Sequence, residues 1–119
     1  MVDSRAVAIA QAHLEAWTNH DLETARGNLA EDVKFHSPAG TLVGPDEYMD
    51  APRGLVQFAR QVVPGSLRVI AAMGDERNAL IMYEVDTETK TFPSAQTWLL
   101  DDSGKIQVER IISYVTPRG

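Results

Sequence analysis

The sequence predicts one α+β domain, in which helices come first and long strands follow. Residues 5–17 repeat apolar side chains at three- and four-residue spacing, which is the period of an amphipathic helix. After Pro64 and Gly65 the chain becomes rich in β-branched and aromatic residues, with turn residues at intervals. A chain of 119 residues suits a single domain with its own core.

The first third of the chain is expected to hold two helices. The first helix begins after a capping residue, Asp3 or Ser4, and its buried stripe includes His13 and Trp17. The tripeptide NHD then breaks the pattern with residues that favour turns and caps. The apolar spacing resumes in residues 22–30, which are expected to form a second, short helix.

A hairpin and a further helix are expected next. Residues 33–37, VKFHS, alternate apolar and polar side chains as a strand does, and residues 41–44, TLVG, are expected to pair with them. Pro45 is followed by two acids, which suits the first turn of a helix. Pro52 and Gly54 interrupt its apolar stripe, so we expect a kink or two separate pieces.

The second half of the chain is expected to form long antiparallel strands. Turn sequences such as GDERN and DDSGK separate the apolar segments. Residues 116–119, TPRG, are expected to be a frayed tail. The four strands are expected within residues 66–76, 78–89, 93–102 and 105–115.

Composition excludes several classes of function. The formal net charge is −6 and no cluster of Lys and Arg is present, which argues against nucleic acid as a partner. No apolar run is long enough to span a membrane and no signal peptide is recognisable, so we expect a cytoplasmic protein. The chain has no cysteine, and its three histidines lack metal-binding spacing. We therefore expect no metal and no organic cofactor.

The chain resembles the nuclear transport factor 2-like (NTF2-like) superfamily in the order of its expected elements. Three segments also carry the resemblance, namely AWTNHDLE, LAEDVKFHSPAGTLVG and DDSGKIQVERIISYV. The nearest likeness is to its SnoaL-like and ketosteroid-isomerase-like branches. This resemblance implies a cone, also described as a cystatin-like α+β roll, in which a curved antiparallel sheet wraps around the N-terminal helices. It also implies a mostly apolar pocket at the open end and a homodimer formed through the outer face of the sheet. The superfamily includes isomerases, epoxide hydrolases, polyketide cyclases and proteins without catalysis.

The resemblance places three residues at the catalytic positions of a ketosteroid isomerase. His13 stands where the family has a tyrosine, Ser37 where it has the carboxylate base, and Gln96 where it has a second hydrogen-bond donor. His13 and Gln96 are able to donate hydrogen bonds, but a serine hydroxyl is too weak an acid to serve as a proton-shuttling base. Steroid isomerase chemistry is therefore disfavoured.

Other branches of the superfamily use carboxylates on the long strands. If Glu84 and Glu109 flank Gln96, they form a base or a water-activating pair, as in an epoxide hydrolase. When positions are counted from the DSGK turn, the resemblance implies that five side chains face the pocket: Gln96, Trp98, Glu109, Ile111 and Ser113. A looser match on the strand expected within residues 78–89 adds Met82 and Glu84.

Two alternatives to these assignments stay open. A shift of one residue on the strand expected within residues 78–89 turns Met82 and Glu84 outward and leaves the cleaner apolar set facing inward, namely Ala79, Ile81, Tyr83 and Val85. In the second alternative, whatever the register, Glu84 and Glu109 are solvated strand residues or halves of ion pairs, and His13 is a hydrogen-bonded core histidine.

The remaining pocket residues follow from helix and strand geometry. Trp17 lies at the base of the first helix, and the two tryptophans either line a ligand cavity or fill the core. Val33 and Phe35 are the apolar members of their strand, so Phe35 and Ser37 are expected to face the pocket while His36 faces the opposite way.

These observations favour a small protein that binds a small, largely apolar molecule. Acid–base chemistry of the isomerase, cyclase or epoxide hydrolase type is expected if it is an enzyme, with Glu84 or Glu109 as the base and Gln96 or His13 as the donor. The alternative is a non-catalytic ligand-binding or dimerisation module of the same fold.

Overall fold

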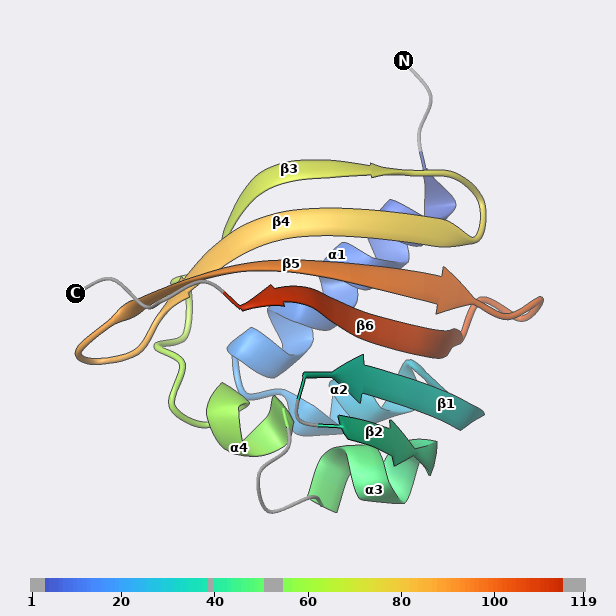
Figure 1. The fold of residues 1–119 in the computed structure, drawn as a ribbon, viewed down its shortest axis with the longest axis horizontal. Helices are drawn as coiled ribbons and strands as arrows, with labels where there is room; N and C mark the ends of the chain where they lie inside the picture. Colours follow the sequence, from blue (N-terminus) through green and yellow to red (C-terminus); the bar gives the residue numbers. More distant parts are fainter. Residues whose placement is uncertain (1–3, 39, 51–54, 115–119) are drawn as a thin grey trace.

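The computed structural model describes residues 4–38, 40–50 and 55–114, of which residues 55, 56 and 112–114 are described without their side chains. Four helices and one sheet of six strands make up this part of the chain (Figure 1). Our expectations for Pro52, Gly54 and residues 116–119 lie outside the described residues. The elements are α1 (Arg5–Thr18), α2 (Leu22–Gly27), β1 (Leu29–Ser37), β2 (Gly40–Val43), α3 (Gly44–Asp50), α4 (Leu55–Ala59), β3 (Arg68–Gly74), β4 (Asn78–Asp86), β5 (Thr91–Leu100) and β6 (Ile106–Tyr114).

The sheet has the strand order β2-β1-β6-β5-β4-β3 and curves around α1 (Figure 1). Helix α1 packs against β3, β4 and β5, while α3 packs against β1. The α+β fold class and the curved sheet around the N-terminal helices are therefore confirmed. The sheet is mixed rather than wholly antiparallel, because β1 runs parallel to β6 while all the other neighbouring pairs are antiparallel.

Side-chain caps fix the starts of the first two helices. The Ser4 hydroxyl accepts a hydrogen bond from the backbone N–H of Val7 at 3.1 Å, so Ser4 is the N-cap of α1. Asp21 caps α2 in the same way, accepting from the backbone N–H of Thr24 at 3.3 Å. The expected break at NHD is confirmed, and it separates the two helices.

The second helix ends earlier than the apolar spacing predicts. Leu29 and Ala30 were expected to continue it, yet both are buried residues at the start of β1. Leu29 pairs with Ile106 of β6, and the Ile106 N–H donates to the carbonyl of Asn28 at 2.8 Å. Pairing with a strand far along the chain thus overrides the local helical pattern.

The register of β4 corrects the looser placement of Met82 and Glu84. Burial alternates along this strand, and its inner face carries Ala79, Ile81, Tyr83 and Val85. Met82 is 46% exposed on the outer face. Glu84 is on that outer face too, where its carboxylate lies 3.6 Å from the Arg68 guanidinium. The inward set is the more apolar one, and burial of apolar surface selects it.

Candidate functional site

A fully buried carboxylate lies at the centre of the inner face of the sheet. Glu109 of β6 has no solvent exposure. In the sheet it is opposite Trp98 of β5 on one side and Phe35 of β1 on the other, and paired residues share a face. Trp98 and Gln96 are two residues apart on β5, so the pleat brings both side chains to the face that carries Glu109.

Three donors converge on the two carboxylate oxygens. The Trp98 indole N–H donates to Oε1 at 2.9 Å, and the Gln96 amide donates to Oε2 at 3.1 Å. The Tyr48 hydroxyl lies 3.0 Å from Oε1 and 3.1 Å from Oε2, so its single proton is shared between them. Tyr48 comes from α3, which lies against β1 (Figure 1). Acceptor-only oxygens surrounded by donors satisfy the buried charge through hydrogen bonds.

His13 of α1 completes the cluster. Its Nε2 is 3.3 Å from Glu109 Oε1 and 3.1 Å from the Tyr48 hydroxyl. The Asn28 amide lies 3.4 Å from the other ring nitrogen, Nδ1. When the Asn28 amide donates to Nδ1, the ring proton is on Nε2 and faces Tyr48 and Glu109. His13, Tyr48 and Glu109 are therefore in contact through a chain of exchangeable protons.

Tyr83 orients the glutamine of this cluster. The Tyr83 hydroxyl on β4 donates to Gln96 Oε1, which leaves the Gln96 amide nitrogen to face Glu109. Ile81 and Gln96 are paired across β4 and β5, so Tyr83 approaches from the next inward position of β4. We call the six side chains His13, Tyr48, Tyr83, Gln96, Trp98 and Glu109 the Glu109 cluster.

The environment keeps Tyr48 in its protonated form. Burial raises the pKa of Tyr48 well above its usual value, and the negative charge and hydrogen bond of Glu109 raise it further. Phe35 packs edge-on against the Tyr48 ring, with 5.5 Å between ring centroids and an angle of 86°. Tyr48 is consequently a fixed donor, held by apolar packing on one side and by the carboxylate on the other.

The structure brings together three of the residues that were counted back from DSGK and one residue of the first helix. Gln96, Trp98, Glu109 and His13 all lie in the Glu109 cluster. Trp17 is buried one helical turn beyond His13, and its indole N–H has no hydrogen-bond partner among the described residues.

Several other expected pocket residues lie elsewhere. Ser37 borders a hollow on the outer face of the sheet, where its hydroxyl is 3.4 Å from the Gly40 carbonyl. The half-buried Ile111 borders the same hollow, but it is paired with Gln96 and packs against the buried core, so its side chain faces inward as expected. His36 borders the same hollow, as expected from the alternation in β1. The side chain of Ser113 lies outside the described part of the chain. Met82 and Glu84 are on the outer face, as stated above.

Three polar residues that contact the cluster were not recognised as site residues from the sequence. Tyr48 is the one phenol in the GPDEYM helix start, and a tyrosine at an apolar position signals a buried hydroxyl that needs a partner. The alternation of β4 places Tyr83 in its apolar set, so its inward orientation was available as the alternative register. Asn28 follows a predicted helix and carries no comparable signal.

The arrangement has the components of proton transfer. A carboxylate, an imidazole and a phenol lie within hydrogen-bonding distance of one another, which is the requirement for general acid–base catalysis. Within the described residues, no group of three or more His, Asp or Glu side chains is arranged to hold a metal ion. No helix in that part of the chain is long and apolar enough to cross a membrane.

Comparison with known proteins gives consistent likenesses. A family model described as a SnoaL-like domain matches residues 10–109. A crystal structure of a protein from Kribbella flavida DSM 17836 is similar, with 32% identity, a TM-score of 0.82, and coverage of 92% of this chain and 87% of that one. No curated protein matches the chain at a significant level.

More distant structures share the fold alone. A SnoaL-like protein of unknown function from Burkholderia thailandensis E264 is 15% identical, with a TM-score of 0.76 over 97% of this chain and 98% of that one. A steroid delta-isomerase from Pseudomonas aeruginosa is 15% identical, with a TM-score of 0.69 over 92% of this chain and 80% of that one. These two likenesses concern the arrangement of helices and strands and carry no reaction with them.

Proposed function

Since the chain belongs to the SnoaL-like domain family, we propose that it binds a small, largely apolar molecule beside the Glu109 cluster and acts on it by acid–base chemistry. Glu109 is the base, and His13 and Tyr48 are the groups that exchange protons with it. The observation that carries this proposal is the buried carboxylate in direct contact with an imidazole and a phenol. A base without bulk water around it is more effective toward a carbon acid than the same group in solution.

The residues around the cluster support an apolar ligand with one hydrogen-bond acceptor. Leu14, Ile81 and Val33 are buried on the elements that carry the cluster or face it. The Trp17 indole N–H is buried on the same face of α1 as His13 and has no partner among the described residues. A buried donor without an acceptor is unfavourable by about 1–3 kcal/mol, and an acceptor atom on a ligand removes that penalty.

A second candidate function is ligand binding without catalysis. The favouring observation is that both Glu109 oxygens already accept hydrogen bonds from side chains of the protein itself. A carboxylate held in this way is a structural feature of the pocket wall unless a substrate displaces one of the donors. Turnover therefore distinguishes the two functions, because both require the same ligand to bind.

The experiment joins mass spectrometry with a chemical probe. Native mass spectrometry of freshly purified protein tests for a co-purified small molecule. The probe is 5-nitrobenzisoxazole, from which a base removes the C3 proton while the N–O bond breaks, giving a nitrile and a coloured phenolate. We expect saturable turnover by the wild type. In Glu109→Gln we expect the turnover rate to fall by about 100-fold or more, which is the range for removing a general base.

Glu84→Gln is the matched control. It makes the same change on the outer face of the same sheet and is expected to leave turnover unchanged. Turnover that is equal in the wild type and Glu109→Gln contradicts the role of Glu109 as base. A bound small molecule without any turnover favours the second candidate function.

We also propose a homodimer formed through the outer face of the sheet. Two exposed methionines on that face support the proposal, Met73 of β3 and Met82 of β4. In the β3–β4 pairing, Met73 is opposite Leu80 and Met82 is opposite Ala71. Clustered exposed apolar side chains are typical of protein interfaces. Light scattering coupled to size-exclusion chromatography measures the mass, and a monomer at micromolar concentration contradicts the proposal.

A further inference from the structure

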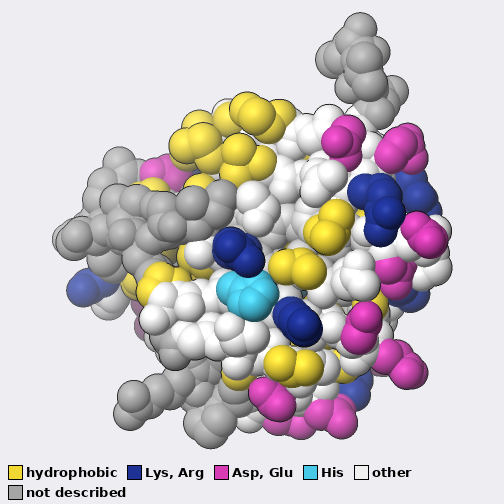
Figure 2. All heavy atoms as spheres, turned by 45° about the vertical axis from the view of Figure 1, so that its right-hand side comes forward, with side chains coloured by type: hydrophobic (Ala, Val, Ile, Leu, Met, Phe, Trp, Pro, Cys, Tyr) yellow, Lys and Arg dark blue, Asp and Glu magenta, His cyan; other side chains and the backbone are white. Residues whose placement is uncertain are grey.

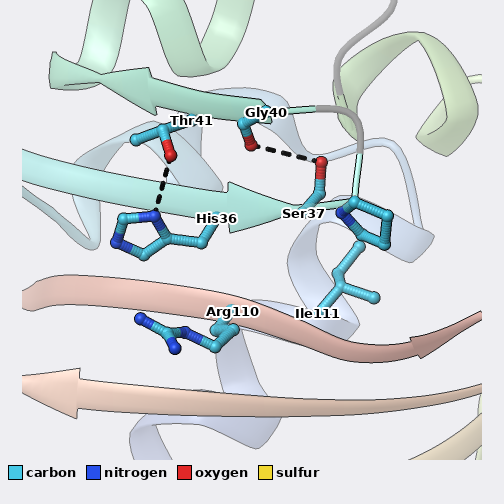
Figure 3. Close-up of a pocket in the computed structure, with 7 residues that line it drawn as sticks. His36, Ser37, Gly40, Thr41, Arg110 and Ile111 are labelled. Carbon is cyan, nitrogen blue, oxygen red and sulfur yellow. Dashed lines mark hydrogen bonds between the residues drawn. The ribbon is translucent and has the colours of Figure 1, made fainter.

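The outer face of the sheet has a hollow over β1, β2 and β6, toward the opposite edge of the sheet from the methionines of β3 and β4. It has a volume of about 320 Å³ and lies where the end of β1 and the middle of β6 meet the start of β2 (Figure 3). Because side chains alternate along a strand, His36 and Arg110 face away from the side of the sheet that carries their neighbours Phe35 and Glu109. The hollow is lined by His36, Ser37, Pro38, Gly40, Thr41, Arg110 and Ile111.

Cationic and donor groups gather at this hollow. His36 and Arg110 are opposite each other in the β1–β6 pairing, and their side chains lie next to one another in Figure 3. Lys34 is two residues before His36 on the same face of β1 and is exposed. Figure 2 shows a histidine on this face with Lys or Arg side chains on two sides of it. The positive charge stands out in a chain whose net charge is −6.

Arg110 and Lys34 have no acidic partner among the described residues. Three other exposed arginines do: Arg26 contacts Asp46, Arg68 is 2.9 Å from Asp86, and Arg77 is 3.4 Å from Asp102. An acidic protein offers many carboxylates, so two unpaired cations on either side of a histidine form a surface that is open to an external anion.

Thr41 fixes which ring nitrogen of His36 faces outward. The Thr41 hydroxyl is 2.9 Å from Nδ1, and β1–β2 pairing holds the two residues opposite each other. If the hydroxyl donates, the neutral ring has its proton on Nε2. If the hydroxyl accepts, the Nδ1 nitrogen holds the proton, and Nε2 of the neutral ring is an acceptor. An anion at Nε2 therefore favours the first arrangement, in which Thr41 donates to Nδ1 and Nε2–H is a donor.

We propose that this hollow binds a small oxyanion, the phosphate or carboxylate group of a small molecule. The planar guanidinium of Arg110 presents parallel N–H donors that match two oxygens of such a group, and His36 Nε2–H adds a donor from the neighbouring strand. Lys34 adds a charge nearby. Arg110 and Lys34 carry positive charge and offer donors only, which favours anions over cations at the hollow. The site is exposed, so affinity on the order of 1 mM is expected.

The test is a titration followed by NMR on the full chain. Inorganic phosphate and acetate are added in separate series, and sodium chloride at matched ionic strength is the reference. We expect saturable shifts of the His36 ring and Arg110 side-chain signals with phosphate or acetate. The arm with the lower Kd identifies whether the natural ligand carries a phosphate or a carboxylate. Shifts that only follow ionic strength, as in sodium chloride, overturn the proposal.

Arg110→Gln and Arg60→Gln are the matched pair of variants. Both replace an exposed arginine, and Arg60 does not line the hollow. Loss of the guanidinium fork in Arg110→Gln is expected to weaken binding about tenfold, whereas Arg60→Gln is expected to change the Kd less than about twofold. Equal weakening in the two variants overturns the assignment, because it reports net charge instead of a site.

Discussion

Tyr48→Phe is the most informative change to the Glu109 cluster, because it deletes one oxygen atom and keeps the ring. The Tyr48 side chain is 2% exposed and packs edge-on against Phe35, a contact that phenylalanine preserves. The change removes the donor at 3.0 and 3.1 Å from the two Glu109 oxygens. It also removes the acceptor at 3.1 Å from His13 Nε2.

The magnitude follows from the charge of the partner. A hydrogen bond to a charged group contributes about 1.5–3 kcal/mol, and a buried charge that loses a donor is not rehydrated. We therefore expect Tyr48→Phe to lower the free energy of unfolding by about 2–3 kcal/mol. The assay is urea unfolding at pH 7 followed by tryptophan fluorescence. If the slope of the free energy of unfolding against urea concentration is the same in the variant and the wild type, their folded and unfolded states are comparable.

Tyr83→Phe is the matched control, since Tyr83 is 3% exposed and donates to the neutral Gln96. A neutral hydrogen bond contributes about 0.5–1.5 kcal/mol, so this variant is expected to lose about 1 kcal/mol. In the Glu109→Gln background the effect of Tyr48→Phe is expected to fall to the same level. A loss below about 0.5 kcal/mol for Tyr48→Phe, or one no larger than for Tyr83→Phe, refutes a charged acceptor at Glu109.

Three further predictions test the cluster, the register and a close backbone contact. The pKa of Tyr48 is raised in the folded state above its ordinary 10.0. The stability that the protonated phenol contributes is therefore complete below pH 10 and is lost as the pH rises through the folded pKa. Above pH 10, the free energy of unfolding of the wild type, measured in urea, is expected to fall more steeply than that of Tyr48→Phe, by up to about 1.4 kcal/mol per pH unit. Ile81→Ala is expected to cost about 2–5 kcal/mol and Met82→Ala less than about 1 kcal/mol in the same assay, whereas the opposite order contradicts an inward Ile81. Gly74→Ala places a Cβ 2.2 Å from the Asn78 carbonyl oxygen and is expected to cost about 1–3 kcal/mol, so unchanged thermal unfolding contradicts that close approach.

Much of the cluster follows from local periodicity. Helical spacing puts His13 on the buried stripe of α1, and strand alternation puts Gln96 and Trp98 on one face of β5. These relations hold within one element, because the period of a helix or a strand fixes which of its side chains share a face. The same rule turns His36 away from the cluster, as expected, and it predicts that Glu109 and Arg110 are on opposite faces.

Relations between elements did not follow in the same way. The sequence leaves two registers of β4 open, and packing against α1 selects the one that buries Ile81 and Tyr83. Ser37 was expected in the pocket by continuing the alternation of Phe35, but β1 ends there and its hydroxyl lies near the Gly40 carbonyl. The end of a strand is where alternation stops being informative, because the pleat no longer holds the next side chain.

The sequence by itself determined the fold class and most helix and strand positions, because these depend on spacing along one segment. Its resemblance to the superfamily, rather than spacing, implied that Gln96, Trp98 and Glu109 face inward. The tertiary structure decided that β1 lies parallel to β6, which makes Leu29 and Ala30 part of a strand. It also decided that Tyr48 reaches Glu109 across 61 positions of the chain. The physical reason is that a buried charge accepts hydrogen bonds from whichever donors packing brings to it, and no local pattern records which donors those are.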